Sequence, residues 1–357
     1  MSLADFGWDD HVEAAFAAHA GKADTVPARV LIEFNHNYRV ATDQGELEAV
    51  LAGRMKHHAQ SRADLPAVGD WVAVRKRPEE DRGAIVAVLK RRSRFSRRTA
   101  GQVTDEQVVA ANADVVFLVM AMDEDFSPRR LERYLLMARE SGAAPVVLLT
   151  KPDLVEDQSA RVADALTVAG DVPVHVVNPR TGQGTEDVAS YLKAGRTGAL
   201  LGSSGVGKST IINRLAGADR QRTREVRAAD SKGRHTTTHR ELIVLPGGGL
   251  MIDTPGMREL QLWDAADGIR ETFDDIDALA GECRFTDCRH RGEPGCAVTA
   301  AVAAGTMPPA RVESYQHLQA ELDYLARQQD ERAQIEEKRR GKIGAKALRQ
   351  HLKSKRG

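Results

Sequence analysis

Apolar residues alternate with polar ones in the first part of the chain, and farther along they gather into longer runs. The alternating part predicts short strands separated by turn signals: Arg29–Phe34, Tyr38–Ala41, Leu47–Leu51, Asp70–Val74 and Ala84–Leu89. Such a series of short strands is typical of a small barrel or sandwich. We expect residues 1–27 to be a helical or irregular lead-in that ends at Pro27. The first domain is predicted to be a β-barrel over residues 1–105.

Between Asn112 and about Leu262 the pattern indicates strands and helices in alternation, which a parallel sheet requires. The segment Asp114–Ala121 is apolar almost throughout, as is typical of a strand buried on both faces. The other expected strands and helices, ending in a hairpin, are Arg129–Glu140, Pro145–Leu149, Gln158–Ala169, Pro173–Val177, Thr197–Leu201, Thr210–Ala216 and Glu241–Ile252. We predict an α/β domain over residues 106–265.

The last part of the chain has the apolar spacing of helices, most clearly over Arg311–Lys338. Its final segment, Lys338–Gly357, holds lysines and arginines but no acidic residue. A block of like charge is typical of a disordered segment or an interaction tail. We predict a helical third domain over residues 266–357.

One stretch of the α/β domain carries a specific chemical pattern. It matches the phosphate-loop pattern G-x-x-x-x-G-K-[ST] between an expected strand and an expected helix. In such a loop, backbone N–H groups and the helix N-terminus surround a phosphate, the lysine reaches the β- and γ-phosphates, and the serine hydroxyl binds Mg²⁺. A glycine-rich turn with a chance lysine is the alternative. The residues expected to bind the phosphates, with Ser209 also on Mg²⁺, are Gly202, Ser203, Ser204, Gly205, Val206, Gly207, Lys208, Ser209 and Thr210.

A second element, Thr150-Lys-Pro-Asp153, ends one of the expected buried strands. The Asp153 carboxylate can accept hydrogen bonds from N1–H and from the 2-amino group of guanine, and adenine lacks both donors. Because hydrogen bonds to charged groups are worth about 1.5–3 kcal/mol each, losing two disfavours adenine by about 3–6 kcal/mol. The methylene groups of Lys151 would lie along the purine face. We predict that guanine is bound by Thr150, Lys151, Pro152 and Asp153.

Two further pieces complete a GTPase site. Asp253-Thr-Pro-Gly256 offers Asp253 to Mg²⁺ through water, and the N–H of Gly256 to the γ-phosphate. The polar segment before the hairpin contains three consecutive threonines, and we expect Thr237 or Thr238 to bind Mg²⁺ in the triphosphate state. Loss of the γ-phosphate would release this segment, as in GTPase switches.

All three cysteines lie in one stretch with the spacing Cys-x₄-Cys-x-His-x₅-Cys. Three thiolates and one imidazole suit tetrahedral Zn²⁺, and four protein ligands leave no open position, as in a structural site. Buried free thiols are the alternative. We expect one zinc ion bound by Cys283, Cys288, His290 and Cys296.

Composition narrows the class of protein. Lys+Arg and Asp+Glu both total 51, so the formal net charge is zero and any basic surface is local. The chain has no apolar run of membrane-spanning length, and its start lacks the basic and apolar regions of a signal peptide. Three clustered cysteines are typical of a reducing compartment. We expect a cytoplasmic protein without a membrane segment.

A basic run, Lys90–Arg98, follows the predicted barrel and contains Phe95. Such a run is either a solvated linker or, beside a nucleic-acid-binding barrel, a strip that contacts phosphates. Barrels of the oligonucleotide-binding type commonly bind single strands or structured RNA, and a barrel used only for packing is the alternative.

The order of these pieces is unusual. In ordinary GTPases the phosphate loop comes before the base-reading element, but here Thr150–Asp153 precedes Gly202–Ser209, so the domain is circularly permuted. With the barrel before it and the cysteines after it, nearly the whole chain resembles the RsgA/YjeQ family of small-ribosomal-subunit biogenesis GTPases. The resemblance implies a factor, which we expect to be a monomer, that binds 16S rRNA on the 30S subunit late in maturation. It also implies slow GTP hydrolysis that the 30S subunit stimulates.

Met257 follows Gly256 where many GTPases have a glutamine that orients the attacking water. Because a thioether cannot orient water, intrinsic turnover is expected to be slow. The resemblance implies His235 as the substitute catalytic residue, and a solvated loop histidine is the alternative.

Asn178-Pro179 stands where a Ser-Ala pair usually offers a backbone N–H to guanine O6. Pro179 has no N–H, so this contact must come from Arg180 or be absent.

Two other functions are compatible with a phosphate loop. An ATPase or nucleotide kinase is disfavoured by Thr150–Asp153. A nucleic-acid-binding adaptor that no longer turns over is disfavoured because Lys208, Ser209 and Asp253 are all intact. A hydrolysis assay with and without 30S subunits separates the three.

Overall fold

The computed structural model describes residues 1–22, 24–34, 37–59, 61–77, 82–98, 106–217, 240–253, 269, 272–323 and 327. The chain divides into two compact units, Met1–Gln261 and Leu262–Gly357. Among the described helices, none combines the length and the apolar character that a membrane crossing needs. The predicted domain boundaries near residues 105 and 265 remain predictions.

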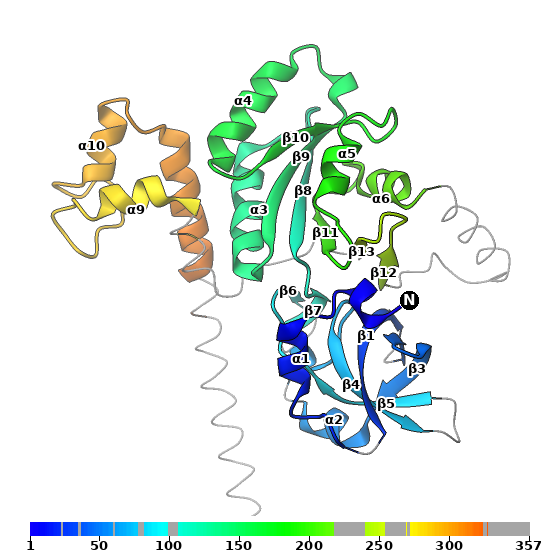
Figure 1. The fold of residues 1–357 in the computed structure, drawn as a ribbon. Coiled ribbons are helices and arrows are strands. Elements are labelled where there is room, and N and C mark those ends of the chain that lie inside the picture. The colour runs from blue at the N-terminus through cyan, green and yellow to red at the C-terminus, as the bar shows by residue number, and fades with distance from the viewer. Residues whose placement is uncertain are drawn as a thin grey trace, which may run out of the picture. The chain divides into compact units, whose positions relative to one another are not determined.

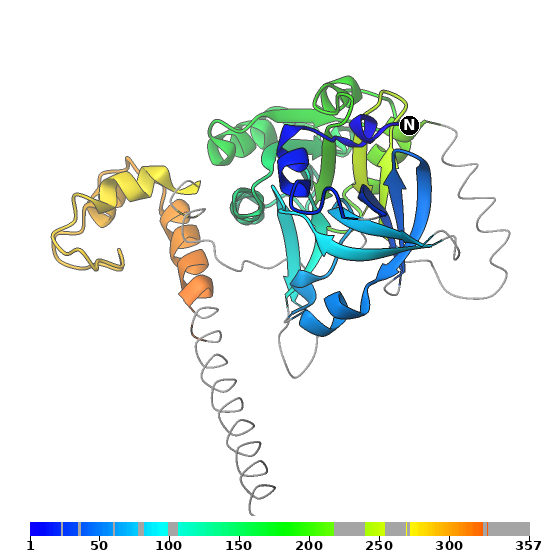
Figure 2. The same ribbon diagram turned by 60° about the horizontal axis from the view of Figure 1, so that its bottom comes forward.

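The N-terminal part is a five-stranded barrel, as predicted (Figures 1 and 2). Its strands are β1 Thr25–Phe34, β2 Asn37–Thr42, β3 Gly45–Leu51, β4 Trp71–Arg77 and β5 Arg82–Val88. They pair in the order β1-β2-β3-β5-β4, and β4 pairs again with β1, which closes the barrel. Inward-facing residues alternate along the strands to form its core: Ala28, Val30, Tyr38, Val40, Ala49, Val72, Val74 and Ile85.

Pro27 lies inside β1 and does not end the lead-in, so that prediction was wrong. The N–H of Val30 donates to the carbonyl of Asp70, and the N–H of Lys76 donates to the carbonyl of Asp24. The backbone N–H and C=O groups of the even-numbered residues of β1 therefore bond to β4. The nitrogen of Pro27 points away from β4, so its lack of an N–H removes no hydrogen bond from this pairing. A strand tolerates proline at such a position.

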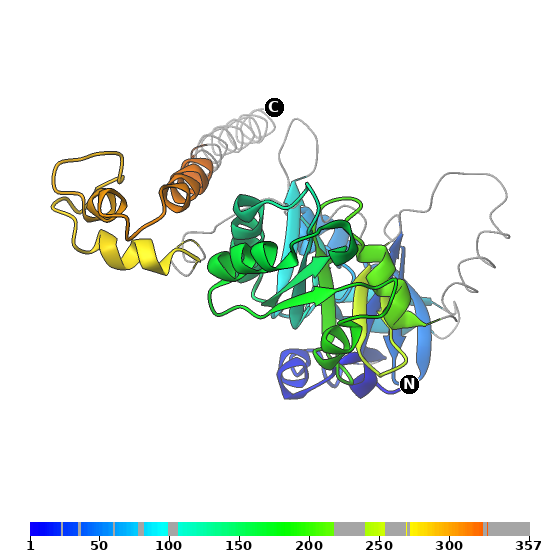
Figure 3. The same ribbon diagram turned by 90° about the horizontal axis from the view of Figure 1, so that it is seen from above.

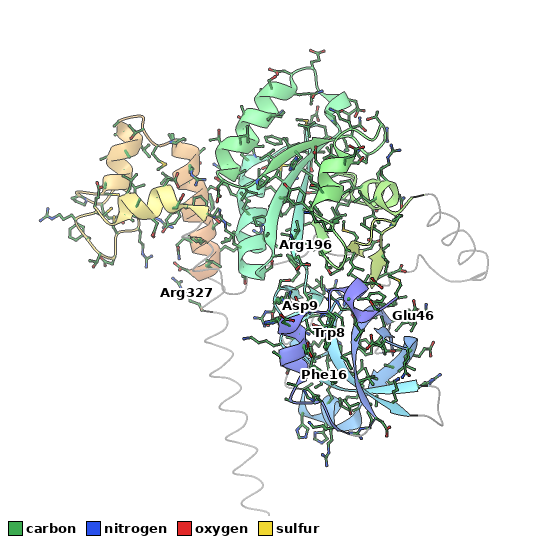
Figure 4. All side chains as sticks on the ribbon, in the orientation of Figure 1. Trp8, Asp9, Phe16, Glu46, Arg196 and Arg327 are labelled. Carbon is green, nitrogen blue, oxygen red and sulfur yellow. The ribbon has the colours of Figure 1, made fainter. Side chains whose placement is uncertain are left out.

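The lead-in residues cover one end of the barrel. Helix α1, Asp10–Phe16, begins where the Asp9 carboxylate accepts hydrogen bonds from the N–H groups of His11 and Val12. Trp8 packs edge-on against Trp71 of β4 with ring centroids 5.2 Å apart, and Figure 4 shows Trp8, Asp9 and Phe16 together beside the barrel. A short helix, α2 Gly53–His58, follows β3.

The basic run after the barrel is partly a strand rather than a linker. β6, Arg94–Arg98, pairs with β7, Glu106–Ala111, which the sequence analysis did not predict. Phe95 is buried in this hairpin. Arg91 is also turned inward, because its guanidinium makes two hydrogen bonds to the buried Asp70 carboxylate at 2.7 and 2.8 Å. The folded barrel thus uses part of the basic run for its own packing.

The α/β domain is built on a parallel sheet, as predicted. Its elements are β8 Val115–Ala121, α3 Pro128–Ser141, β9 Ala144–Thr150, α4 Gln158–Ala169, β10 Val174–Val177, α5 Thr185–Ser190, β11 Thr197–Leu201, α6 Lys208–Ala216, β12 Arg240–Val244 and β13 Leu250–Asp253. The strands lie in the order β10-β9-β8-β11-β13-β12, with only β12 antiparallel to its neighbour. Every residue of β8 is buried, because α3 and α4 cover one face of the sheet while α5 and α6 cover the other (Figure 3).

The barrel and the parallel sheet form one continuous sheet of eleven strands. The joint is the antiparallel pair β1–β12, in which Ile32 lies opposite Glu241 and Glu33 lies opposite Arg240. The Arg240 guanidinium lies 2.8 Å from the Glu33 carboxylate, and both side chains are mostly buried. Nearby, the buried Arg29 of β1 donates to the hydroxyl of Thr197 at the start of β11.

The described part of the second unit consists of short helices and the loops that connect them. It contains α9 Asp274–Ala280, α10 Ala297–Ala303 and a helix over 309–323. Arg311 binds the Asp275 carboxylate at 2.6 Å and lies over the Phe273 ring, so it joins the third helix to the first. The basic segment Lys338–Gly357 lies outside the described residues.

Candidate functional site

The parallel strands point the same way, so their carboxyl ends lie on one side of the sheet. From β8 the chain proceeds outward to β9 and β10, and then α5 returns it to β11 on the other side of β8. The direction of strand order therefore reverses between β8 and β11. In open α/β sheets, ligands bind beyond the carboxyl ends of the strands at such a reversal. The loops after β8, β9 and β11 all start on this side, and β13 ends there at Asp253.

The predicted phosphate loop follows β11 and leads directly into α6. A Cβ atom at Gly202 would lie 2.3 Å from the carbonyl oxygen of Val119, so only glycine fits there. Gly205 and Gly207 have φ angles of 79° and 101°, which favour glycine, and nothing lies within 4 Å of where their Cβ atoms would be. The loop thus leaves open space at the N-terminus of α6, where the helix dipole favours an anion.

Lys208 is the first residue of α6 and turns back over the loop. Its ammonium group donates to the carbonyl of Gly202 at 2.7 Å and also to the carbonyl of Ser203. These contacts hold the positive charge above the loop, where the β- and γ-phosphates are expected.

Two side chains of α3 brace the phosphate loop, and sequence reasoning missed both. Arg130 donates to the Ser203 hydroxyl at 3.1 Å, and the Tyr134 hydroxyl lies 3.3 Å from the same oxygen. Arg130 is also paired with Asp125, at 2.7 Å. Only their helical spacing of four residues, on a helix next to the site, could have indicated these roles.

Thr150 connects the two parts of the predicted site. It is fully buried at the end of β9, and its hydroxyl donates to the carbonyl of Val206 in the phosphate loop at 2.6 Å. The same hydroxyl lies 3.3 Å from the carbonyl of Met120. The base-reading element and the phosphate loop therefore lie side by side, although about fifty residues separate them in the sequence.

Lys151 has a φ angle of 56°, which turns the chain sharply after the strand. Its ammonium group donates to the Asp123 carboxylate at 2.8 Å, and this hydrogen bond lowers the pKa of Asp123. Asp123 is a residue that sequence reasoning missed, although its place just after the buried strand β8 was a usable signal.

Asp153 is held by the loop that follows β10. Its carboxylate accepts a hydrogen bond from the side-chain amide of Asn178 at 2.9 Å. The carbonyl oxygen of that amide accepts from the N–H of Arg180 at 3.1 Å. The Arg180 N–H, which was expected either to reach guanine O6 or to leave that contact unmade, is engaged within the loop here.

Asp253 ends β13, next to the strand that leads into the phosphate loop. The magnesium role of Asp253 stays a prediction. The other predicted residues of this half, His235, Thr237, Thr238 and Gly256, lie outside the described residues, as does Met257.

The second unit brings the four predicted metal ligands together. Their ligand atoms all lie within 4.8 Å of one another. The Nδ1 atom of His290 lies 3.6 Å from the sulfur of Cys283 and 3.5 Å from that of Cys296, and these two sulfurs are 3.9 Å apart. Tetrahedral zinc, with Zn–S of about 2.3 Å and Zn–N of about 2.0 Å, spaces sulfurs about 3.8 Å apart and a sulfur and a nitrogen about 3.5 Å apart. The residues present therefore fit zinc.

The surroundings of the cluster favour metal binding. Cys296 caps α10, and its sulfur accepts from the N–H of Thr299 at 3.4 Å. Burial opposes ionisation of Cys296, but hydrogen bonds from Thr299 and His290 outweigh it and lower the pKa of this thiol to about 6. The Gln316 amide donates to the carbonyl of His290 and so ties the third helix to the cluster. A metal ion there would connect the loops and helices of this unit.

Comparison with known proteins identifies close relatives. The family model described as RsgA GTPase matches residues 88–263. A "Small ribosomal subunit biogenesis GTPase RsgA" from Opitutus terrae is 50% identical over 339 residues, which cover 92% of this chain and 92% of the relative. A protein of the same name from Syntrophotalea carbinolica is 44% identical over 350 residues, 96% of this chain and 95% of the relative.

Solved structures share the fold. YjeQ from Thermotoga maritima matches with a TM-score of 0.62 and 26% identity, over 84% of this chain and 98% of its own. YloQ, described as a circularly permuted GTPase, matches with a TM-score of 0.57 and 22% identity, over 88% of this chain and 98% of its own. The permuted order of elements is therefore found in a solved structure of the same fold.

Proposed function

This chain belongs to the RsgA family of small ribosomal subunit biogenesis GTPases, and from that membership we propose that it acts in late maturation of the 30S subunit. It is a GTP hydrolase. We propose that it binds the 16S rRNA of the immature subunit, works in the cytoplasm as a monomer, and hydrolyses GTP slowly until the subunit stimulates it.

One observation carries the nucleotide site of this proposal. The 2.6 Å hydrogen bond from Thr150 to Val206 joins the base-reading element to the phosphate loop, so a single nucleotide can extend from one to the other. Asp153 then recognises guanine, Lys208 neutralises the β- and γ-phosphates, and Ser209 binds Mg²⁺. Asp253 would hold the same magnesium ion through a bound water molecule. When it is bound, magnesium would neutralise part of the charge of the phosphates.

The remaining residues of the site belong to the switch side. We propose Thr237 or Thr238 as a further magnesium ligand and the N–H of Gly256 as a γ-phosphate contact. Because Met257 cannot orient water, we propose His235 as the catalytic residue that the ribosomal subunit brings into place.

Two surfaces suit an RNA partner. Helix α2 of the barrel exposes Arg54, Lys56, His57 and His58 together. In the second unit, the cysteine-containing loops expose Arg284, Arg289 and Arg291. Phe285 is also exposed there, with the guanidinium of Arg284 over its ring at 5.5 Å. Cations attract the phosphate backbone, and exposed aromatic rings stack with unpaired bases.

GTP hydrolysis measured with and without purified 30S subunits tests the proposed function. We expect low release of phosphate by the protein alone and a large increase with subunits, and Lys208→Ala as control should show neither. His235→Ala should still bind GTP but lose the stimulated part. Equal hydrolysis with and without subunits would contradict the assembly role.

Nucleotide competition separates the alternative functions. An ATPase or nucleotide kinase would bind ATP at least as well as GTP, whereas an adaptor would bind GTP without releasing phosphate under any condition. Neither outcome is expected, because Asp153 selects guanine and Lys208, Ser209 and Asp253 are all present.

A further inference from the structure

We propose that Asn178 is a specificity-determining residue of the guanine site, because its side-chain amide orients the Asp153 carboxylate for the base. The inference rests on the proposed role of Asp153 in guanine recognition. It assigns to Asn178 a positioning role and no part in the chemical step.

The contacts of Asn178 support this role. The residue is buried, with an exposed fraction of 6%. Its amide nitrogen donates to one oxygen of Asp153 at 2.9 Å, and its carbonyl oxygen accepts from the N–H of Arg180 at 3.1 Å. The side chain is thus fixed at both ends, and it fixes one oxygen of Asp153. The other oxygen of that carboxylate is left for the base edge.

The backbone of Asn178 has a separate task. Its N–H donates to the carbonyl of Gln183, and its carbonyl accepts from the N–H of Gly182, both at 2.9 Å. These bonds shape the loop whatever side chain the residue carries. A substitution that changes only the amide should therefore leave the loop folded, which allows the side-chain role to be tested alone.

The loop makes recognition depend heavily on Asp153. Pro179 has no N–H, and the N–H of Arg180 is donated to Asn178. In this conformation neither of the two residues after Asn178 has a backbone N–H available for guanine O6. A hydrogen bond depends steeply on its direction, so a carboxylate free to rotate loses part of its preference for guanine. An oriented Asp153 compensates for the donor that the loop lacks.

A nearly isosteric substitution separates the donor from the acceptor. In Asn178→Asp, one carboxylate oxygen can still accept from the N–H of Arg180, while the N–H donor to Asp153 is gone. Two carboxylates this close share a proton at low pH, and they repel each other once both are ionised. The shared proton would replace the lost donor. Three cations belong to the segments around Asp153 and residue 178. They are Arg180 in the same loop, Lys151, which donates to Asp123, and Arg214 of α6, whose guanidinium lies against Gly182.

The experiment measures displacement of fluorescent mant-GDP from the full-length protein by GTP, ITP and ATP. ITP lacks only the 2-amino group of GTP, so the GTP/ITP ratio reports contact with Asp153. We expect Asn178→Ala to lower the GTP preference over ITP and ATP by about tenfold, the worth of one hydrogen bond to a charged group. Asn178→Ser, which restores a hydroxyl donor, should recover most of it. ATP affinity should stay unchanged in every variant, which serves as the folding control.

The pH profile distinguishes positioning from a structural role. For Asn178→Asp we expect near-parent affinity for mant-GDP at low pH and progressive weakening, relative to the parent, as the pH rises. Should Asp153→Asn lose guanine preference while both Asn178→Ala and Asn178→Asp keep it at every pH, the inference is overturned and the proposed function stands. If the parent itself does not prefer GTP to ATP, the proposed guanine site and the inference fail together.

Discussion

The two units of this chain hold their sites in different ways. In the first, the nucleotide loops are anchored on a buried sheet, and a large apolar cluster that includes Phe117, Leu148 and Ile211 packs beneath them. In the second, the described residues include only a few buried apolar side chains: Ile269, Phe273, Ile276, Cys296, Val298, Met307, Val312 and Leu318. A small core seldom stabilises a domain unless a metal or a disulfide adds to it.

The difference indicates what each site needs before its ligand arrives. The nucleotide loops have their shape already, because glycine geometry and the bond from Thr150 to Val206 fix them. The metal ligands of the second unit come from loops with little apolar support. We therefore expect the first unit to fold without nucleotide and the second to depend on its metal.

Zinc removal should have the largest effect. A zinc-selective chelator, added with excess Mg²⁺, should unfold residues 272–323 and leave guanine nucleotide binding intact, because metal binding and folding are coupled in small metal domains. Hydrogen–deuterium exchange followed by mass spectrometry reads both units in one sample. Zinc added back is the control. Continued protection of peptides from 272–323 without metal would contradict the expected dependence of the second unit on its metal.

Lys208→Ala should have the opposite pattern. We expect nucleotide affinity to fall on the order of a thousandfold, since two or more charge-assisted hydrogen bonds to phosphate are lost. The thermal unfolding of the first unit should hardly change. Isothermal titration with GDP and calorimetric unfolding of the same preparation check both parts. Parent-like affinity would remove the phosphate-loop assignment.

Asp153→Asn should have a narrower effect. The amide keeps an acceptor but loses the charge, so the preference for GTP over ATP should fall on the order of a hundredfold while ATP affinity stays the same. Competition with mant-GDP measures the ratio directly. An unchanged ratio would refute the base-reading role of this element, while leaving the phosphate loop untouched.

Arg240→Met should have the smallest effect. The substitution keeps much of the apolar stem and leaves Glu33 without its ion-pair partner at a mostly buried position, which should destabilise the first unit by about 1–3 kcal/mol. Urea unfolding measures the change. Glu33→Gln and the double variant complete a cycle, and additive effects in that cycle would show that the two side chains do not interact.

Much of the fold followed from periodicity. The strand β8 is buried on both faces, so its apolar run was unmistakable, and α4 was predicted with its observed bounds. The barrel strands were found because one face of each is core. By contrast, β6 and β7 were missed, since the arginines around Phe95 obscured the inward alternation, and the pairing of β1 with β12 joins segments too distant for any local pattern.

The candidate site likewise contains residues that a local sequence pattern predicts and residues that only the fold brings together. The phosphate loop and the zinc ligands are encoded by consecutive residues or by tight spacing, so the sequence alone predicts them. Asp123, Arg130 and Asn178 are single polar residues whose roles depend on which loops the fold brings together. Their spacing or their place after a strand marks them only as candidates, and the strand order is needed to assign their roles.

The joint between β1 and β12 has a consequence for how the chain is made. Ile32 emerges from the ribosome long before Glu241, the residue opposite it in the finished sheet. Synthesis adds about 5–20 residues per second, so the edge of β1 waits for its partner on the order of ten seconds or more. During that interval the barrel can close through β4, but one stretch of β1 remains open to any other strand. We therefore expect chaperone binding or premature association during translation to involve the edge formed by Ile32 and Glu33.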